Sequence, residues 1–252
     1  MHSFAKFCIS PASLVEKENL SAFVKALKIQ SNSNDALLPY HDSNNFTDDT
    51  DSITDNEGKR IRAPRYFGAG GEFLAETFLE VFSQEYNVTN IESIDDEDKS
   101  GKDRGVDLTA RVIKGKVYKE FNCAARTNSP VFIQVKTAVR SNKEYKTNDG
   151  SRIMNFFGHA QAAARSEGAA YTARYILFTT GQGIHYQLKE NTFGLIQVIN
   201  FKEISDKIKG NRVFWNRMRE KFGLAVLPLD ALAVDADFES VEEELRQEVD
   251  IE

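Results

Sequence analysis

A lysine stands at the end of a short apolar stretch, where a charged side chain needs a partner or a task. Residues Pro130–Lys136 read Pro-Val-Phe-Ile-Gln-Val-Lys, and their β-branched and aromatic side chains predict a buried strand. Side chains alternate along a strand, so Gln134 and Lys136 point to the same face. Burying an ammonium group costs free energy unless something compensates it. The end of this strand is therefore the first place to look for chemistry.

Acidic side chains occur in two elements that precede this strand. Asp107 is the acid of an otherwise apolar run that predicts a strand over Gly105–Val112. Glu72 and Glu76 lie one turn apart on one face of a predicted helix over 72–85. Carboxylate, amide and carbonyl oxygens are ligands that Mg²⁺ binds, at roughly 2.0–2.1 Å. These residues together would form a magnesium site.

A magnesium site with a lysine beside it is suited to phosphodiester hydrolysis. That reaction needs an activated water and stabilisation of negative charge, and the metal ion supplies both. Asp107 would ligate the metal directly, and the amide oxygen of Gln134 would ligate it or hold a metal-bound water. Lys136 would orient the attacking water or stabilise the developing charge.

The elements that must position these residues follow one another in a recognisable order. The predicted order of elements is a helix, three strands, a helix and a strand. Their ranges are 72–85, 87–93, 105–112, 130–136, 151–167 and 175–180. A further strand over 194–200 and helices over 201–209 and 213–222 follow. An insertion at Lys114–Ser129 interrupts the strands, and we interpret it as an extra hairpin that touches substrate. The fold class expected is α/β, with a central mixed sheet flanked by helices.

This ordered set resembles the PD-(D/E)XK, or restriction-endonuclease-like, nuclease superfamily. The resemblance covers about residues 66–200, and its Gln-x-Lys form is similar to Mrr-type enzymes and to relatives of Holliday-junction resolvases. It is carried by the following pieces: Gly71-Glu72-Phe-Leu-Ala-Glu76, Gly105-Val-Asp107-Leu, Ile133-Gln-Val-Lys136, and the later helix with Tyr175-Ile-Leu-Phe-Thr-Thr. It implies an αβββαβ core and a metal-dependent DNA endonuclease that uses Mg²⁺ or Mn²⁺. Members often cut two strands as dimers, so a homodimer is compatible with it.

The resemblance also implies roles for individual residues. Asp107, Gln134 and Lys136 would be catalytic, and the backbone carbonyl of Val135 would be a further metal ligand. An acid from the preceding helix would complete the site; spacing slightly favours Glu76 over Glu72, without separating them. Two departures stand out. Gln134 replaces the usual acid, and Val106 replaces the proline that precedes the aspartate.

Basic residues around these elements are the expected phosphate contacts, which position a nucleic acid without reading its sequence. They are Arg126, Arg140, Lys143, Lys146, Arg152 and Arg165. The net charge of −6 is unevenly distributed, which leaves room for such a surface. Residues 61–222 hold 25 basic and 19 acidic residues, whereas residues 223–252 hold one arginine and ten acids. We therefore divide the chain into an N-terminal helix with a polar linker (1–60), a nuclease-like domain (61–222) and an acidic tail (223–252).

Several other function classes find no support in the sequence. No run of 18 apolar residues predicts a spanning helix, and the N-terminus lacks the form of a signal peptide. Cys8 and Cys123 have neither zinc spacing nor a disulfide framework, which favours a reducing, cytoplasmic compartment. The acids at Asp48–Asp55 lack the glycine and closing glutamate of a calcium loop, so a solvated linker is favoured.

Each candidate also has a purely structural interpretation. Asp107 and Lys136 would then form an ion pair at the end of a strand, and the basic residues would form a solvated face. His159 and His185 are interpreted as surface or packed residues, and Phe156 and Phe157 as core. The protein would then be an inactive nuclease-fold module that binds DNA, or a protein-interaction factor.

The acidic tail predicts an effect on nucleic-acid binding. Deleting residues 228–252 should strengthen binding to DNA at low salt, because the tail repels the phosphates or covers the basic surface. Titration of a labelled duplex at low and high ionic strength measures it. Equal affinity of the full and shortened chains at low salt would contradict this idea.

Overall fold

The computed structural model of the protein describes most of the chain: residues 3–6, 8, 10–31, 53–54, 60–61, 63–94, 105–146 and 151–229. Three segments discussed above lie wholly or mostly outside these ranges. They are the polar linker with Asp48–Asp55, the segment at Asp95–Asp103 between the strands expected over 87–93 and 105–112, and the acidic tail from Asp230 onward.

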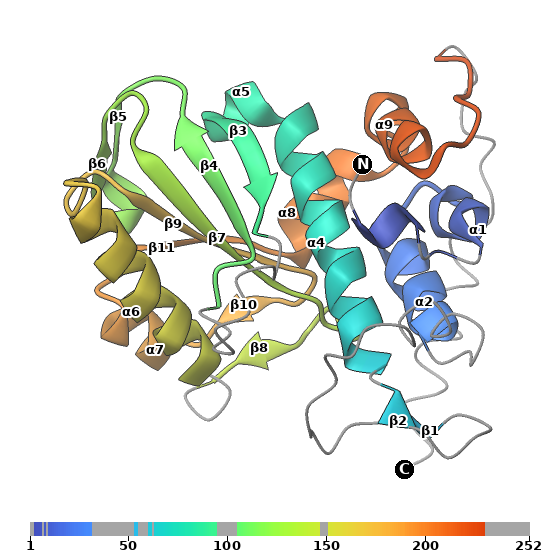
Figure 1. The fold of residues 1–252 in the computed structure, drawn as a ribbon, viewed down its shortest axis with the longest axis horizontal. Helices are drawn as coiled ribbons and strands as arrows, with labels where there is room; N and C mark the ends of the chain where they lie inside the picture. The colour runs from blue at the N-terminus through green and yellow to red at the C-terminus, as the bar shows by residue number, and fades with distance from the viewer. Residues whose placement is uncertain are drawn as a thin grey trace.

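A five-stranded mixed sheet forms the centre of the fold (Figure 1). Its strands are β3 (Val88–Ser93), β4 (Leu108–Val112), β7 (Pro130–Lys136), β9 (Arg174–Thr179) and β11 (Ile196–Ile199). The spatial order is β11-β9-β7-β4-β3, with β3, β4 and β7 antiparallel and β7, β9 and β11 parallel. The predicted α/β class with a central mixed sheet is confirmed.

The central strand is β7, and its bounds are those expected from the sequence. Its first six residues are buried and Lys136 is half-buried. A strand that is covered on both faces carries apolar residues at nearly every position rather than at alternate ones. Val131 and Ile133 belong to the apolar core on one face of the sheet, and Phe132 to the core on the other.

Two helices cover opposite faces of the sheet. On one face lies α4 (Ala63–Val81), whose Phe78 ring centroid is 5.4 Å from that of Phe178 in β9. On the other lies α6 (Ser151–Ser166), whose Phe157 ring centroid is 5.2 Å from that of Tyr175 in β9. The predicted order of helix, three strands, helix and strand is thus present as α4, β3, β4, β7, α6 and β9.

The first of these helices departs from the prediction at both ends. It starts nine residues before Glu72, so Gly68, Gly70 and Gly71 lie inside α4 rather than ahead of it. It ends at Val81, and a short helix α5 (Ser83–Tyr86) follows. Glycine lowers helix propensity, which is why the sequence suggested a later start, but tertiary packing overrides propensity here.

The insertion between β4 and β7 is a small hairpin, as interpreted. It contains β5 (Lys116–Tyr118), the 3₁₀ turn η3 (Lys119–Phe121) and β6 (Cys123–Ala125), with β5 and β6 antiparallel. Short elements that the sequence did not predict are β8 (Glu144–Tyr145), β10 (Gly183–Ile184) and α7 (Tyr186–Asn191). The strands β8 and β10 pair in parallel.

Helices from both ends of the chain pack beside α4. They are η1 (Ser3–Lys6), α1 (Pro11–Val15), α2 (Leu20–Ser31), α8 (Phe201–Ile208) and α9 (Arg212–Phe222). One antiparallel pair of two-residue strands, β1 (Ile53–Thr54) and β2 (Arg60–Ile61), precedes α4. Side chains of α2, α4, α8 and α9 belong to one buried apolar cluster.

The single N-terminal helix expected over Ser13–Leu27 is interrupted at Glu18. Glu18 has φ 48°, and its buried carboxylate accepts a hydrogen bond from Arg219 of α9 at 2.8 Å. Arg212 also lies 3.3 Å from the same oxygen. Paired and hydrogen-bonded in this way, the buried charge ties the N-terminal helices to the C-terminal helix. No helix of the described ranges is long and apolar enough to cross a membrane.

Candidate functional site

Asp107 lies against the backbone of β7. The pairing of β4 with β7 ends at Leu108 and Ile133. The Asp107 N–H donates to the Ile133 carbonyl at 2.9 Å, and the Val135 N–H donates to Asp107 Oδ2 at 2.5 Å. The carboxylate thus takes the place of a strand neighbour where β4 has stopped. The structure brings together two parts of the predicted site that are 28 residues apart in the chain.

Gln134 is fully buried on the face of β7 that α6 covers. Its exposed fraction is 0%, and among the described residues neither its amide oxygen nor its amide nitrogen has a hydrogen-bond partner. Gly105 packs over it: a Cβ at Gly105 would lie 3.1 Å from Gln134 Nε2 and 3.2 Å from Phe156 Cβ. Gly105 also has φ +69°, a conformation that favours glycine.

A buried amide without partners is costly. Leaving a buried donor or acceptor unsatisfied costs about 1–3 kcal/mol per group, so natural proteins retain such groups for a reason. An amide oxygen is also an acceptable ligand for a hard cation. The orphaned amide of Gln134, next to the Asp107 carboxylate on β7, is the observation that fits a metal ion at this place.

Lys136 ends β7 on the same face as Gln134 and is half-buried. It forms no ion pair with Asp107 or with any other carboxylate of the described residues. Asp107 and Lys136 therefore do not form the ion pair that the purely structural interpretation expects.

The two candidate acids on α4 have different surroundings. Glu76 Oε2 lies 3.4 Å from Lys221 Nζ of α9, and Lys221 also bonds Glu80 at 2.9 Å. Glu76 therefore faces α9. Glu72 follows Gly71, whose backbone packs on the end of β7, since a Cβ there would lie 3.3 Å from Val135 Cγ1. The residue before Glu72 thus contacts the end of β7, whereas Glu76 is paired with α9.

The six basic residues fall into two groups. Because α6 connects the parallel strands β7 and β9, it returns from the end of β7 to the start of β9. Arg152 in its first turn therefore lies at the Lys136 end of the sheet, and so do three residues between β7 and α6: Arg140, Lys143 and Lys146. All four are exposed.

Arg126 and Arg165 lie at the opposite end of the sheet. Arg126 precedes β7, and Arg165 is in the last turn of α6. A strand of seven residues spans roughly 23 Å, so these two are not neighbours of the Asp107 end. Sequence position alone did not separate them from the other four.

The hairpin of β5 and β6 also lies at the far end of β7. Arg174, at the start of β9, is 1% exposed, and its guanidinium carbon lies 4.5 Å from the centre of the Tyr118 ring. Its NH1 donates to the Tyr86 carbonyl at 2.8 Å. Burial lowers the pKa of Arg174 and raises the pKa of Cys123. The hairpin is thus anchored in the core, away from Asp107, and was interpreted from the sequence as touching substrate.

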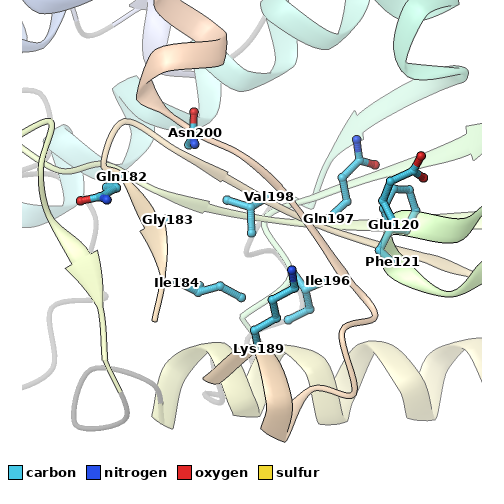
Figure 2. A pocket seen from close by; sticks show the side chains of 10 residues that line it. All are labelled: Glu120, Phe121, Gln182, Gly183, Ile184, Lys189, Ile196, Gln197, Val198 and Asn200. Carbon is cyan, nitrogen blue, oxygen red and sulfur yellow. The ribbon is translucent and has the colours of Figure 1, made fainter. Parts of the chain in front are cut away.

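A hollow of about 390 Å³ runs along the edge strand β11 (Figure 2). Its apolar lining includes Ile184, Ile196 and Val198, and Lys189 of α7 reaches toward it. Two amide side chains of its lining are hydrogen-bonded within the fold. Gln197 Oε1 accepts from Arg174 NH2 at 2.7 Å, and Asn200 Oδ1 caps α8. The strand β11 is separated from β7 by β9, so this hollow is distinct from the Asp107 end.

The remaining residues singled out in the sequence behave as packing predicts. Phe156 and Phe157 are buried in the core between α6 and the sheet, as interpreted. His159 is exposed on α6, and His185 precedes α7. Sequence reasoning missed Gly105 as the cover of Gln134 and Thr137 as the contact of Gly71; both adjoin residues that it named.

Comparisons with protein-family models, with curated proteins and with solved structures find no match for this chain. Within the described residues, no three acid, histidine or cysteine side chains are grouped to hold a metal ion. A cation at the end of β7 would therefore be bound by amide or carbonyl oxygens together with carboxylates.

The unsatisfied amide predicts an unusual stability effect. Gln134→Met should raise the free energy of unfolding of the metal-free protein by about 1–3 kcal/mol, because it removes buried polar groups that lack partners. Urea unfolding in the presence of a chelator measures it. Gln197→Met is the matched control and should be destabilising, because it leaves NH2 of the buried Arg174 without its acceptor. Equal destabilisation by both substitutions would show that the Gln134 amide is satisfied in solution.

Proposed function

We propose that the protein is a metal-dependent DNA endonuclease of the restriction-endonuclease-like type, with Mg²⁺ or Mn²⁺ as its cofactor. The observation that carries this proposal is the Asp107 carboxylate held against Val135 N–H, beside the partnerless amide of Gln134, on the strand that ends in Lys136. The element order α4–β3–β4–β7–α6–β9 agrees with the resemblance that the sequence motifs carry.

Four oxygen donors are proposed to hold the cation. They are the carboxylates of Asp107 and Glu72, the amide oxygen of Gln134 and the backbone carbonyl of Val135. We prefer Glu72 to Glu76, because the preceding residue, Gly71, packs on Thr137 and Val135 at the end of β7. When bound, the cation would lower the pKa of a water molecule and neutralise charge on the phosphate.

The chain's own residues have complementary tasks in this proposal. Asp107 orients the site, because the Val135 N–H holds one of its carboxylate oxygens against the end of β7. Lys136 places a positive charge where negative charge grows on the phosphate as water adds and the P–O ester bond breaks. The leaving oxygen takes up the proton of the attacking water. One end of the cut strand then carries a phosphate and the other a hydroxyl group.

The exposed basic residues at this end of the sheet would hold the DNA backbone. Lys143 lies over the Tyr145 ring at 5.7 Å, which places a cation beside the parallel pair of β8 and β10. Together with Arg140, Lys146 and Arg152, it surrounds the end of β7. Contacts of this kind bind phosphates and position the scissile bond without reading sequence.

Cleavage of supercoiled plasmid DNA tests the catalytic assignment. With Mg²⁺ or Mn²⁺ present, wild-type protein should nick or linearise the plasmid, and Asp107→Ala and Lys136→Ala should each lower the rate about 10²- to 10⁴-fold. His159→Ala, on the exposed side of α6, should cleave as wild type does. Retardation of DNA in a gel by a wild-type protein that cuts nothing would instead support an inactive binding module.

The two ends of α6 offer a matched test of the DNA surface. Arg152→Ala should weaken duplex binding and reduce the slope of log affinity against log salt by about 0.9, the value for one lost phosphate contact. Arg165→Ala removes the same charge from the same helix at the opposite end of the sheet, and should leave the slope unchanged. Equal effects of both substitutions would place the DNA elsewhere.

A further inference from the structure

Two adjacent glycines occupy the interior of α4, next to the proposed metal ligand Glu72. Glycine weakens a helix relative to alanine, so a pair of them inside a long helix needs a compensating reason. Tertiary contacts on two different sides of the helix provide that reason.

Gly71 is the point at which α4 touches the end of β7. A Cβ at this position would lie 1.8 Å from Thr137 Oγ1, 3.1 Å from Thr137 Cβ and 3.3 Å from Val135 Cγ1. The Thr137 hydroxyl oxygen is buried and has no hydrogen-bond partner in the part of the chain that the structure describes. The contact is therefore a van der Waals contact, in which the helix backbone packs directly on the residue that follows Lys136.

Gly70 makes the corresponding contact with the N-terminal helix α2. A Cβ here would lie 2.4 Å from Leu27 Cδ1 and 2.6 Å from Leu27 Cδ2. Leu27 is 0% exposed and belongs to the core that α2 shares with α4. The helix α4 is thus clamped at Gly70–Gly71 between α2 and β7. Gly68, two residues earlier, has nothing within 4 Å of its missing Cβ.

We infer that Gly70 and Gly71 are positioning residues, which set the distance between Glu72 on α4 and the Asp107–Lys136 end of β7. This inference rests on the proposed function. It makes α2 part of the support of the site, because Leu27 holds the other side of the same helical turn.

A small displacement at this contact would matter, because metal ligands must be held at precise distances from the ion. A Cβ at Gly71 would have to move from 1.8 Å to at least 3.0 Å from Thr137 Oγ1, so the Thr137 side chain would have to rotate or the helix and the strand would have to separate, by up to about 1.2 Å. Metal ligands must be held within about 0.2 Å of their preferred distances, and misplacement of about 1 Å costs on the order of 10²-fold in rate.

The test compares Gly71→Ala with Gly68→Ala in the full-length protein. Binding of Mn²⁺ is measured by calorimetry, plasmid cleavage by gel, DNA binding in chelator, and folding by circular dichroism. Gly71→Ala should lower Mn²⁺ affinity at least 10-fold and cleavage about 100-fold, with DNA binding in chelator unchanged. Gly68→Ala should match wild type in all four measurements.

Rescue separates positioning from a general loss of stability. Adding Thr137→Ala to Gly71→Ala removes the 1.8 Å contact and leaves only the contacts at 3.1 and 3.3 Å, so Mn²⁺ affinity should return to within about threefold of wild type. Thr137→Val alone should retain full affinity, because the hydroxyl makes no hydrogen bond. Loss of Mn²⁺ binding in Thr137→Val would assign the hydroxyl a ligand role and overturn the inference.

A second variant serves if Gly71→Ala does not fold. Gly70→Ala meets only the end of the Leu27 side chain and should fold, with a loss of Mn²⁺ affinity between those of Gly68→Ala and Gly71→Ala. Wild-type affinity in a folded Gly71→Ala or Gly70→Ala protein, with wild type itself binding and cutting, would overturn the inference alone. A wild-type protein that neither binds Mn²⁺ nor cuts DNA would overturn the proposed function and the inference with it.

Discussion

The central strand β7 is longer than the neighbour that pairs with it on one side, and much of the site follows from that mismatch. Its backbone is buried, so every N–H and C=O needs a partner. The strand β4 supplies partners only as far as Ile133. Beyond that residue, the carboxylate of Asp107 accepts the N–H of Val135 at 2.5 Å. A negatively charged group is thereby held at a fixed place beside the last three residues of the strand.

The two ends of the sheet serve different purposes. At the start of β7 and β9, polar groups are hydrogen-bonded within the fold. Arg174 donates to backbone carbonyls and to Gln197, and it stacks on Tyr118. At the other end, the amide of Gln134 has no partner and Lys136 forms no ion pair within the described residues. Polar groups that the fold does not use, gathered at one end of a rigid sheet, are what a binding or catalytic site requires.

Glycines occur where other backbones approach this end. Gly105 covers Gln134 and Phe156 from one face, and Gly71 rests on Thr137 from the other. The N-terminal helices support the same region from outside, through Leu27 against Gly70 and through Glu18 against Arg219. Segments that composition separates into an N-terminal appendage and a central domain therefore share one core around α4. At Gly70 and Gly71 the absence of a side chain is what allows these close approaches.

The sequence by itself determined the types and the order of the main elements. The bounds of β7 match the apolar run, and α6 and β9 lie within a residue of their predicted limits, because periodic burial leaves a periodic pattern of side chains. The contact of Asp107 with β7 could also be predicted, from the order of the motifs in the sequence. Only the tertiary structure paired Glu76 with Lys221, placed Arg126 and Arg165 away from the other basic residues, and brought Leu27 and Thr137 against Gly70 and Gly71. These outcomes depend on which way each chain segment runs and on what packs against it, and no local pattern of residues encodes the distance between two segments that meet only when the chain is folded.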